Sequence, residues 1–540
     1  MPPQPPPQAP GAQRAPGTSA PAPGSAPTAP FVVIGAGLAG VHLAQRLGEP
    51  AGPTAAPGTG TGAGSGTGSG AARGPGSGVV LIGDEPHAPY NRVLLAEVLA
   101  HRYGPEVIAL PRPHGTFLRT RATRIDRARR AVHCADGTVV PYGTLVLATG
   151  SNPVLPPLRG LLTPGAAALP RGVHAFRTLD DCLALSAAVR PGVRAVVVGG
   201  GLLGVSAAGA LARRGAGVVL AQQAEHLMER QLDPASGRLV DRHLKGLGVE
   251  VHTACRVRGV GVEAGAVRSV ELADGYVLGT DLLVLACGVR PRTGLAADAG
   301  LQVRRGIVVD DELRTCDPHI RAIGDCAEHA GEVPGLAAAA LDQAELLARA
   351  LTPPHPPVRY RGTRALTRLT LATTANAPAA GSATAAPGPT RTTGTPGAIR
   401  TTGTPETTGT AETADTALTA DTSYPASTPA HTGSTTTTTP AAAPAAHLEL
   451  AAFGDPEPRP GDDVVQLTDA TRGTYRKLVV RGDRLAGGVL LGELGTVGAL
   501  ARAWEADDAL YDDDTGTGTG TGGSGNGAPL LHLLTNDGGS

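Results

Sequence analysis

Two glycine clusters have a residue type and spacing that could bind the phosphates of a dinucleotide. Each has the pattern G-x-G-x-x-G and follows a short apolar run; the members are Gly35, Gly37 and Gly40 in the first glycine turn, and Gly199, Gly201 and Gly204 in the second. In this pattern the first glycine permits a tight turn, the second lets a pyrophosphate approach the backbone, and the third lets a helix pack closely on a strand. The amino end of that helix then directs N–H groups towards the phosphates.

An acidic residue about 20 positions after the first glycine would hold the ribose hydroxyls of such a ligand. After the first glycine turn the candidates are Asp84 and Glu85, and Asp84 lies 49 residues beyond Gly35. The Gly/Ser/Thr-rich stretch 49–78 supplies 30 of those residues, and leaving it out reduces the separation to 19. We therefore interpret 49–78 as an insertion between a helix and the second strand. Glu85 is the favoured ribose ligand, and Asp84 is the alternative.

The second glycine turn has no such acid. The strand that follows it ends in VVLAQQAEH, with Gln222 and Gln223 in the expected place. Arg213 and Arg214 lie on the preceding helix and not after this strand. Two dinucleotides on one chain suggest a flavin and a nicotinamide, but these residues leave the choice between NADH and NADPH open.

The elements that must position these turns alternate along the chain. FVVIGAGLAGVHLAQRL and RAVVVGGGLLGVSAAGALARRG each indicate a strand, a turn and a helix, and further strands are predicted at VVLIGDE, LVLATG, VVLAQ, DLLVLACG and IRAIGD. Apolar strands alternating with helices predict parallel sheets covered on both faces. The expected fold class is α/β, with two Rossmann-like dinucleotide-binding domains, a small α+β C-terminal domain and disordered insertions. In that last domain VRGDRLAGGVLL predicts a hairpin across Gly-Asp, and a short helix is expected from Val497 to Trp504.

Composition separates the folded part of the chain from the rest. Of 540 residues, 76 are Gly and 48 are Pro, and only 2% are aromatic. Segments rich in Gly, Pro, Ser or Thr cannot bury enough apolar surface to offset the entropy of the chain. Four such segments are predicted to be disordered: 1–30, 49–78, 372–446 and 512–540.

Charge and cysteine usage exclude several functions. The net charge is −1 with no basic stripe, so neither nucleic acid nor an anionic membrane surface is an expected partner. The six cysteines lack C-x-x-C or C-x-x-x-x-C spacing, and no histidine pair has metal-binding spacing. No metal site, cysteine-ligated cluster or redox-active disulfide within one helical turn is therefore predicted. Isolated thiols, and residues 1–30 without an apolar stretch typical of a signal peptide, indicate a cytoplasmic protein.

One uncharged segment, Ala195–Ala212, is nearly long enough to span a bilayer. Its glycines have the spacing of a strand, a turn and a helix, which is the better interpretation. No membrane association is expected.

Five motifs, in their order along the chain, resemble the pyridine nucleotide–disulfide oxidoreductase superfamily. They are the first glycine turn, PYNR, ATG, the second glycine turn and a Gly-Asp pair. The resemblance implies that the first turn binds FAD and the second NADH or NADPH, and that Asp325 holds the flavin ribityl chain. A helix after Asp325 would direct its positive end at the flavin, and His329 is a candidate flavin contact. The implied FAD ligands are Gly35, Gly37, Gly40, Asp84, Glu85, Asn91, Arg92, Ala148, Thr149, Gly150, Gly324 and Asp325, and the implied NAD(P) ligands are Gly199, Gly201, Gly204 and Gly288.

The domain boundaries expected from this resemblance divide the FAD-binding domain into two parts. They are 31–160 for its first part, 161–274 for the NAD(P)-binding domain, 275–352 for the second FAD part, and 356–371 with 447–511 for the C-terminal domain. The stretch 372–446 is then a linker within the C-terminal domain.

A finer resemblance is to the flavoprotein portion of NAD(P)H nitrite reductase large subunits and to assimilatory nitrate reductase electron-transfer subunits. It rests on PYNRVLLAEVLAHRY, LMERQLDPASGRLVDRHLKGLGVE, RTCDPHIRAIGDCAEH and RGTYRKLVVRGDRLAGGVLLGEL. It implies electron transfer from NAD(P)H through FAD to a redox protein, either an iron–sulfur protein or a nitrate or nitrite reductase subunit, in nitrate or nitrite assimilation. A homodimer is a further expectation. The chain lacks the cysteine clusters of full nitrite reductases, so it is not expected to reduce nitrite alone.

Several other functions are compatible with parts of this pattern. A rubredoxin or ferredoxin reductase would have the same architecture. A disulfide reductase or a peroxidase of the superfamily needs cysteine in the helix after PYNR, where RVLLAEVLAHRYG has none, and a quinone reductase usually ends in an amphipathic anchor. Glu97 stands about where related reductases often have lysine, and Ser206 where many have glutamate. These two departures keep open a flavin-bound sensor or scaffold without turnover.

Overall fold

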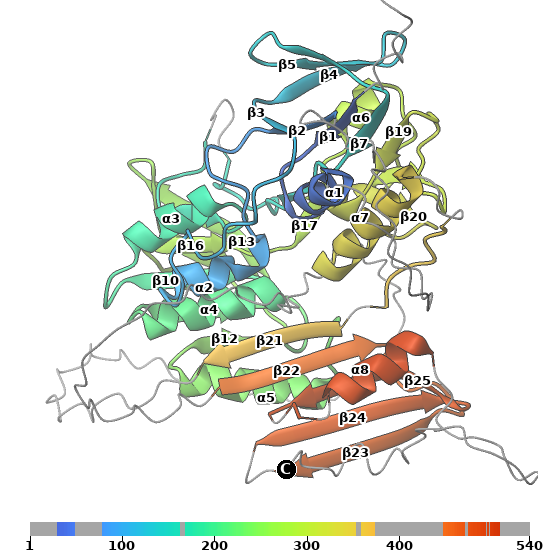
Figure 1. The fold of residues 1–540 in the computed structure, drawn as a ribbon. Coiled ribbons are helices and arrows are strands. Elements are labelled where there is room, and N and C mark those ends of the chain that lie inside the picture. Colours follow the sequence, from blue (N-terminus) through green and yellow to red (C-terminus); the bar gives the residue numbers. More distant parts are fainter. Residues whose placement is uncertain are drawn as a thin grey trace, which may run out of the picture.

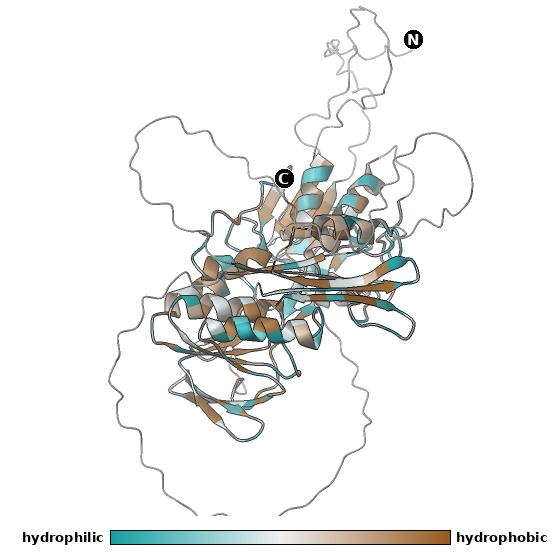
Figure 2. Cartoon of the chain, turned by 90° about the horizontal axis from the view of Figure 1, so that it is seen from below, coloured by the Kyte–Doolittle hydropathy of each residue, from teal (hydrophilic) through white to brown (hydrophobic). Residues whose placement is uncertain are grey.

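Three five-stranded sheets organise the molecule (Figure 1). The computed structural model describes residues 30–48, 78–162, 168–352, 358–364, 366–372, 447–469, 473–492, 494–495 and 497–507. Two of the sheets are parallel and each carries one glycine turn, whereas the third is antiparallel and lies beside the second glycine-turn domain. Hydrophobic residues are concentrated in the strands and on one side of the helices (Figure 2).

The first parallel sheet has the order β19-β7-β1-β2-β3. Its strands are β1 (Phe31–Ile34), β2 (Val79–Gly83), β3 (Thr116–Arg119), β7 (Thr144–Leu147) and β19 (Ile320–Ala322). Helices α1 (Leu38–Gly48) and α7 (Ala337–Leu351) pack against each other beside this sheet. Val32, Val33, Leu145 and Val146 are fully buried, because strands covered on both faces are apolar along their length.

The junction around the 49–78 segment is ordered on both sides. Helix α1 ends at Gly48, and β2 begins at Val79 in parallel register with Phe31. The Phe31 N–H donates to the Gly78 carbonyl at 2.6 Å. Of the segments predicted to be disordered, residues 1–29, 49–77, 373–446 and 512–540 lie outside the described part of the chain, whereas Ala372 ends strand β21 (Leu366–Ala372).

The second parallel sheet has the order β12-β11-β10-β16-β9. Its strands are β9 (Val173–Ala175), β10 (Arg194–Val198), β11 (Gly217–Ala221), β12 (Glu250–His252) and β16 (Leu282–Leu285), and its helices are α3 (Leu179–Ala188), α4 (Leu202–Arg213) and α5 (Pro234–Gly246). A three-stranded antiparallel sheet of β13 (Val257–Glu263), β14 (Ala266–Leu272) and β15 (Val277–Gly279) is inserted before β16.

The boundary expected at residue 274 falls too early. Strands β15 and β16 both belong to the second domain, and β16 pairs with the central strand β10. The chain leaves this domain through β17 (Val289–Pro291), which pairs antiparallel with the outgoing β8 (Ser151–Pro153). The apolar run DLLVLACG predicts a strand correctly, but a run of this kind does not show which sheet it joins.

The third sheet has the order β21-β22-β25-β24-β23 and forms the C-terminal domain with α8 (Val497–Ala506). Its strands are β21 (Leu366–Ala372), β22 (His447–Gly454), β23 (Asp463–Asp469), β24 (Thr474–Arg481) and β25 (Arg484–Leu491). The predicted hairpin is present, with Arg481 opposite Arg484 across Gly482 and Asp483. Residues 358–364, expected in this domain, form no strand; Tyr360 is buried in the core of the first domain instead.

Short elements complete the fold. They are β4 (Ala122–Asp126), β5 (Ala131–Cys134), β6 (Val139–Pro141), β18 (Ile307–Val309), β20 (Ala327–His329), α2 (Leu95–Leu99), α6 (Gly294–Asp298) and the 3₁₀ turns η1 (Arg92–Leu94) and η2 (Gly324–Cys326). In the described ranges no helix is long and apolar enough to cross a membrane, and Ala195–Ala212 forms β10, the second glycine turn and most of α4.

The C-terminal sheet packs by both of its faces. On β22, Leu450 and Ala452 join the core of the second parallel-sheet domain, whereas Ala451 and Phe453 join a separate core under α8. Successive side chains of a strand point to opposite faces, so this alternation commits the strand to one register.

A buried ion pair joins the C-terminal sheet to the second domain. Asp233 caps α5 by accepting from the Ser236 N–H at 2.9 Å, and its other oxygen accepts from Tyr475 at 2.6 Å and from Lys477 at 2.9 Å. Burial alone would raise the pKa of Asp233, but these hydrogen bonds outweigh it and lower the pKa from 3.8 to about 2. The Asp233 carboxylate must therefore stay ionised for this ion pair to stabilise the interface.

Replacing residues 49–77 with a short Gly-Ser linker should leave the fold and the flavin content unchanged. Gly78 is retained because its carbonyl accepts from Phe31. Shortening the loop should change the free energy of unfolding only slightly, since each doubling of loop length costs about 0.6 kcal/mol. Flavin absorbance per protein and the midpoint of thermal unfolding are the measurements, and a loss of flavin would show that the segment has a structural role.

Lys477→Met should reduce the free energy of unfolding by about 1.5–3 kcal/mol at neutral pH, because a charged hydrogen bond to buried Asp233 is lost. The pKa of Asp233 is depressed in the folded state, so the stabilisation is complete above pH 3.8 and is lost as the pH falls towards 2. The difference between wild type and variant should shrink over that interval in urea titrations.

The matched control is Lys245→Met, which breaks an exposed pair with Asp241 on α5. It should cost about 0.5 kcal/mol or less. Equal losses in the two variants at neutral pH would contradict the role given to the buried pair.

Candidate functional site

The first glycine turn is shaped by close backbone contacts. Gly35 has φ +117°, and a Cβ on it would lie 2.0 Å from the carbonyl oxygen of Ala148. A Cβ on Gly40 would lie 1.9 Å from the Gly35 carbonyl oxygen, so a side chain there would separate α1 from β1. At Gly37, by contrast, nothing lies within 4 Å. The middle glycine therefore faces open space into which a phosphate could approach.

The second glycine turn repeats this geometry. Gly199 has φ +107° with a would-be Cβ 2.4 Å from the Ala286 carbonyl oxygen, and a Cβ on Gly204 would lie 1.8 Å from the Gly199 carbonyl oxygen. Nothing lies within 4 Å of a Cβ on Gly201. Two independent turns with the same tight and open positions are a specific fit to two dinucleotide pyrophosphates.

A cavity of about 550 Å³, called here the first cavity, adjoins the first glycine turn. Eight of the predicted FAD ligands line it: Gly35, Gly37, Asp84, Glu85, Arg92, Ala148, Thr149 and Gly150. The Thr149 hydroxyl donates to the Arg292 carbonyl at 2.8 Å, and the Arg292 N–H donates to the Gly150 carbonyl at 2.9 Å. These bonds hold the returning chain against the end of β7.

Both candidate ribose acids lie in the first cavity and both have partners. Glu85 forms an ion pair with Arg92 and accepts from the Tyr90 hydroxyl at 2.6 Å. Asp84 accepts from Arg121 Nε at 3.0 Å. Burial raises the pKa of the Tyr90 hydroxyl, which keeps it a hydrogen-bond donor to Glu85. The contacts do not choose between the two acids.

Four predicted FAD residues do not line the first cavity. Gly40 packs α1 on its strand, and Asn91 caps η1 by accepting from the Val93 N–H at 3.1 Å. Gly324 donates its N–H to Gln343 Oε1 of α7 at 2.7 Å. The fourth, Asp325, lies one hydrogen bond from the cavity. His329, the candidate flavin contact, is instead 3.0 Å from Asp311 and stacks edge-on against Tyr360.

Asp325 is joined to the first cavity by two residues that line it. Its Oδ2 atom accepts from Ser151 Oγ at 2.7 Å and from Arg177 Nη2 at 2.8 Å. The side chain of Arg177 is 7% exposed and that of Asp325 15%. A charged pair this deeply buried needs good geometry and additional hydrogen bonds to offset its desolvation, and Ser151 supplies one of them.

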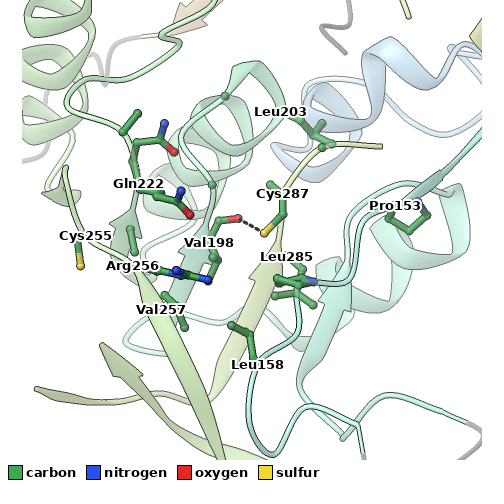
Figure 3. Close-up of a pocket in the computed structure, with 18 of the residues that line it drawn as sticks. Pro153, Leu158, Val198, Leu203, Gln222, Cys255, Arg256, Val257, Leu285 and Cys287 are labelled. Atoms are coloured by element: carbon green, nitrogen blue, oxygen red, sulfur yellow. Dashed lines mark hydrogen bonds between the residues drawn. The ribbon is translucent and has the colours of Figure 1, made fainter. Parts of the chain in front are cut away.

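A second cavity, of about 1060 Å³, opens at the second glycine turn (Figure 3). Of the predicted NAD(P) ligands Gly199, Gly201 and Gly288 line it, and Gly204 packs α4 against β10 instead. Gln222 also lines it and accepts from the Gly200 N–H at 2.8 Å, so the glutamine occupies the place of the missing acid.

Arg177 lines both cavities and is the residue at which they meet. Its Nε atom is buried and has no hydrogen-bond partner within the described residues. An unsatisfied buried donor in a native fold calls for an explanation such as an absent ligand, and an oxygen of a bound nucleotide would satisfy it. This role could not be predicted from the sequence, because Arg177 belongs to no motif and its partners Ser151 and Asp325 lie 26 and 148 residues away.

The six cysteines are all free thiols in the described structure. The described structure contains no disulfide, and Cys287 in the second cavity donates to the Val198 carbonyl at 3.5 Å. Burial raises the pKa of Cys287 to about 11 and that of Cys182 to about 12. Such thiols stay protonated near neutral pH and are poor nucleophiles. Neither they nor any His/Cys/Asp/Glu cluster in the described ranges forms a metal site.

Comparison with known families decides the assignment. The pyridine nucleotide-disulphide oxidoreductase model matches residues 29–344, which is more than half of the chain. The chain belongs to this family. It is therefore an NAD(P)H oxidoreductase whose cofactors are FAD and NAD(P)H. A second model, the rubredoxin NAD⁺ reductase C-terminal domain, matches residues 445–506 of this oxidoreductase.

Relatives in sequence include two Bacillus subtilis proteins. The chain is 37% identical over 278 residues to a nitrite reductase [NAD(P)H], covering 50% of this chain and 34% of that protein. It is 37% identical over 279 residues to an assimilatory nitrate reductase electron transfer subunit, covering 50% and 35%. Rhodocoxin reductase of Rhodococcus erythropolis is 34% identical over 291 residues, covering 51% and 66%. The matched part thus spans about a third of the first two relatives.

Solved structures show the same fold. A ferredoxin reductase from Rhodopseudomonas palustris superimposes with a TM-score of 0.59 at 24% identity, covering 85% of this chain and 91% of that one. Putidaredoxin reductase in its covalent complex with putidaredoxin gives a TM-score of 0.62 at 22% identity, covering 89% and 93%.

Asp325→Ala should weaken FAD binding about 10- to 100-fold, the effect of losing one charged hydrogen bond. The proposed contact is between the carboxylate and the flavin ribityl hydroxyls. FAD retained after gel filtration, followed by FAD titration of the apoprotein, measures the effect.

Cys326→Ala is the matched control. Its thiol is buried, donates to the Leu147 carbonyl at 3.4 Å and lines neither nucleotide cavity. Circular dichroism of both apoproteins separates flavin affinity from folding. Equal flavin affinity in the two variants would refute the role of Asp325.

Proposed function

We propose that this chain passes electrons from NAD(P)H through FAD to a separate redox protein. The observation that carries the proposal is the meeting of the two cavities at Arg177, because hydride transfer requires the two nucleotides to come into contact. In this proposal FAD lies in the first cavity and NAD(P)H in the second. The remaining predicted ligands, including Asp325 and Gly288, keep the roles given to them above.

The chemistry that the bound cofactors supply is hydride transfer from the nicotinamide to the flavin. The chain contributes binding and orientation. The two glycine turns bind the phosphates, and the acids after β2 bind a ribose. Asp325 accepts a hydrogen bond from Arg177 and so holds the positively charged guanidinium at the junction. Phe176 and Leu203 line the second cavity near the junction and give it an apolar surface there.

The positions that depart from relatives do not obstruct this function. Glu97 forms an ion pair with Arg102 at 3.0 Å and lines neither nucleotide cavity. Ser206 donates to the Leu202 carbonyl one turn earlier in α4, at 2.8 Å, and also lies outside both cavities. The alternative of a sensor or scaffold without turnover gains no support from either residue.

The position of the C-terminal domain indicates where the electron acceptor would bind. Arg368 and Leu369 of β21 reach a small cavity of about 50 Å³ that Arg177 and Arg92 also line. The domain therefore comes close to the nucleotide junction, and we propose that it guides an acceptor protein. A nitrate or nitrite reductase component fits the Bacillus relatives. A small iron–sulfur protein or rubredoxin fits the C-terminal family match and rhodocoxin reductase.

Under anaerobic conditions NADPH or NADH should reduce the bound flavin, seen as loss of its visible absorbance. Nitrite consumption by this chain alone should be undetectable, because six electrons must be delivered at a metal centre and the cysteines show no cluster spacing. A one-electron dye should restore turnover. A flavin that stays oxidised with both coenzymes would contradict the proposed function.

A further inference from the structure

The edge of the second cavity beside Gln222 carries positive charge where a Rossmann domain holds the adenosine ribose. That ribose lies at the end of the strand after the glycine turn, where an acid binds the 2′-hydroxyl of NAD and an arginine accommodates the 2′-phosphate of NADP. Here the strand is β11, which ends at Ala221. Gln222 follows it and is neutral, so a phosphate at this position would meet no carboxylate on the strand end.

Arg256 is fixed beside this strand end by the backbone. The Gln222 N–H donates to the His252 carbonyl at 2.8 Å, and the Cys255 N–H donates back to the Gln222 carbonyl at 2.8 Å. A third bond joins Ala254 to Ala224 at 2.7 Å. These bonds hold the backbone at Arg256, the residue after Cys255, next to Gln222.

The Arg256 side chain extends into the cavity. Figure 3 shows its guanidinium reaching inwards on the same side as Gln222. In the part of the chain that the structure describes, this guanidinium forms no hydrogen bond or ion pair with another side chain. A planar guanidinium with available donors is the group that binds phosphate with two parallel hydrogen bonds.

The charge of the lining favours a phosphate as well. Five arginines and one carboxylate, Glu229, are among the described lining residues. Three of the arginines have interaction partners: Arg159 with Glu271, Arg177 with Asp325, and Arg230. Glu229 accepts from Gln222 Nε2 at 3.5 Å, and Arg230 beside it also lines the cavity. Arg256 and Arg258 are therefore the lining arginines available to a phosphate, against the single acid Glu229.

We infer that the second cavity selects NADPH over NADH, with Arg256 binding the 2′-phosphate and neutral Gln222 in place of the ribose acid. The inference rests on the proposed function, because it names the substrate of that same site. It assigns to Arg256 a specificity-determining role in coenzyme binding.

The test is calorimetric titration of the full-length, FAD-loaded protein with two fragments, adenosine 2′,5′-bisphosphate and adenosine 5′-monophosphate. The bisphosphate should bind about tenfold or more tightly, the expected effect of a charged hydrogen bond. Its affinity should also fall more steeply with salt, because the added contact is between exposed charges.

Arg256→Gln should weaken the binding of the bisphosphate about tenfold relative to the wild type. Its affinity for the monophosphate should stay within about twofold of the wild-type value. Arg268→Gln is the matched control, since Arg268 is an exposed arginine on β14 outside the cavity. Gln222→Glu should shift preference towards NAD⁺, while its carboxylate still accepts from the Gly200 N–H.

Equal affinity of the wild type for both fragments would overturn the inference. An Arg256→Gln variant that loses affinity for both fragments by the same factor would overturn it as well. The wild-type comparison keeps the test decisive if a variant does not fold. Failure of the proposed function has a different signature, namely a flavin that neither coenzyme reduces.

Discussion

A buried ion pair between Arg177 and Asp325 lies where the two nucleotide-binding domains meet. Each partner comes from a different domain, and breaking such a pair by removing one charge typically costs about 3–5 kcal/mol. Ser151, on the strand that leaves the first domain, donates to the same carboxylate oxygen. The pair therefore fixes the orientation of one cavity relative to the other. Hydride transfer tolerates little misplacement, so this orientation is a condition for the function.

The C-terminal domain extends the same constraint. Its sheet shares a core with the second domain through Leu450 and Ala452, and Lys477 binds Asp233 at the cap of α5. Any motion of the second domain about the ion pair at the junction must therefore carry the C-terminal sheet with it. Arg368 of the same sheet reaches the small cavity that Arg177 also lines, so the C-terminal domain adjoins the junction of the two nucleotide cavities.

Local patterns in the sequence predicted the local structure well. The glycine spacing predicted both turns, and the Gly482-Asp483 pair predicted a hairpin, because such features depend on a few adjacent residues. The boundary near 274 was misplaced because the strand Leu282–Leu285 is equally apolar in either sheet. Tyr360 was assigned to the C-terminal domain because it shortly precedes the strand Leu366–Ala372 in sequence, although it is buried in the core of the first domain. Arg177 was missed altogether, since its role arises from partners distant in sequence, which no motif reports.

Stopped-flow reduction of the bound flavin under anaerobic conditions, with coenzyme deuterated at either face of nicotinamide C4, tests the contact between the two nucleotides most directly. If the two cavities hold flavin and nicotinamide in one fixed orientation, deuterium on one face should slow reduction and deuterium on the other should not. Equal rates with both labels at saturating coenzyme, or no reduction at all, would contradict this arrangement.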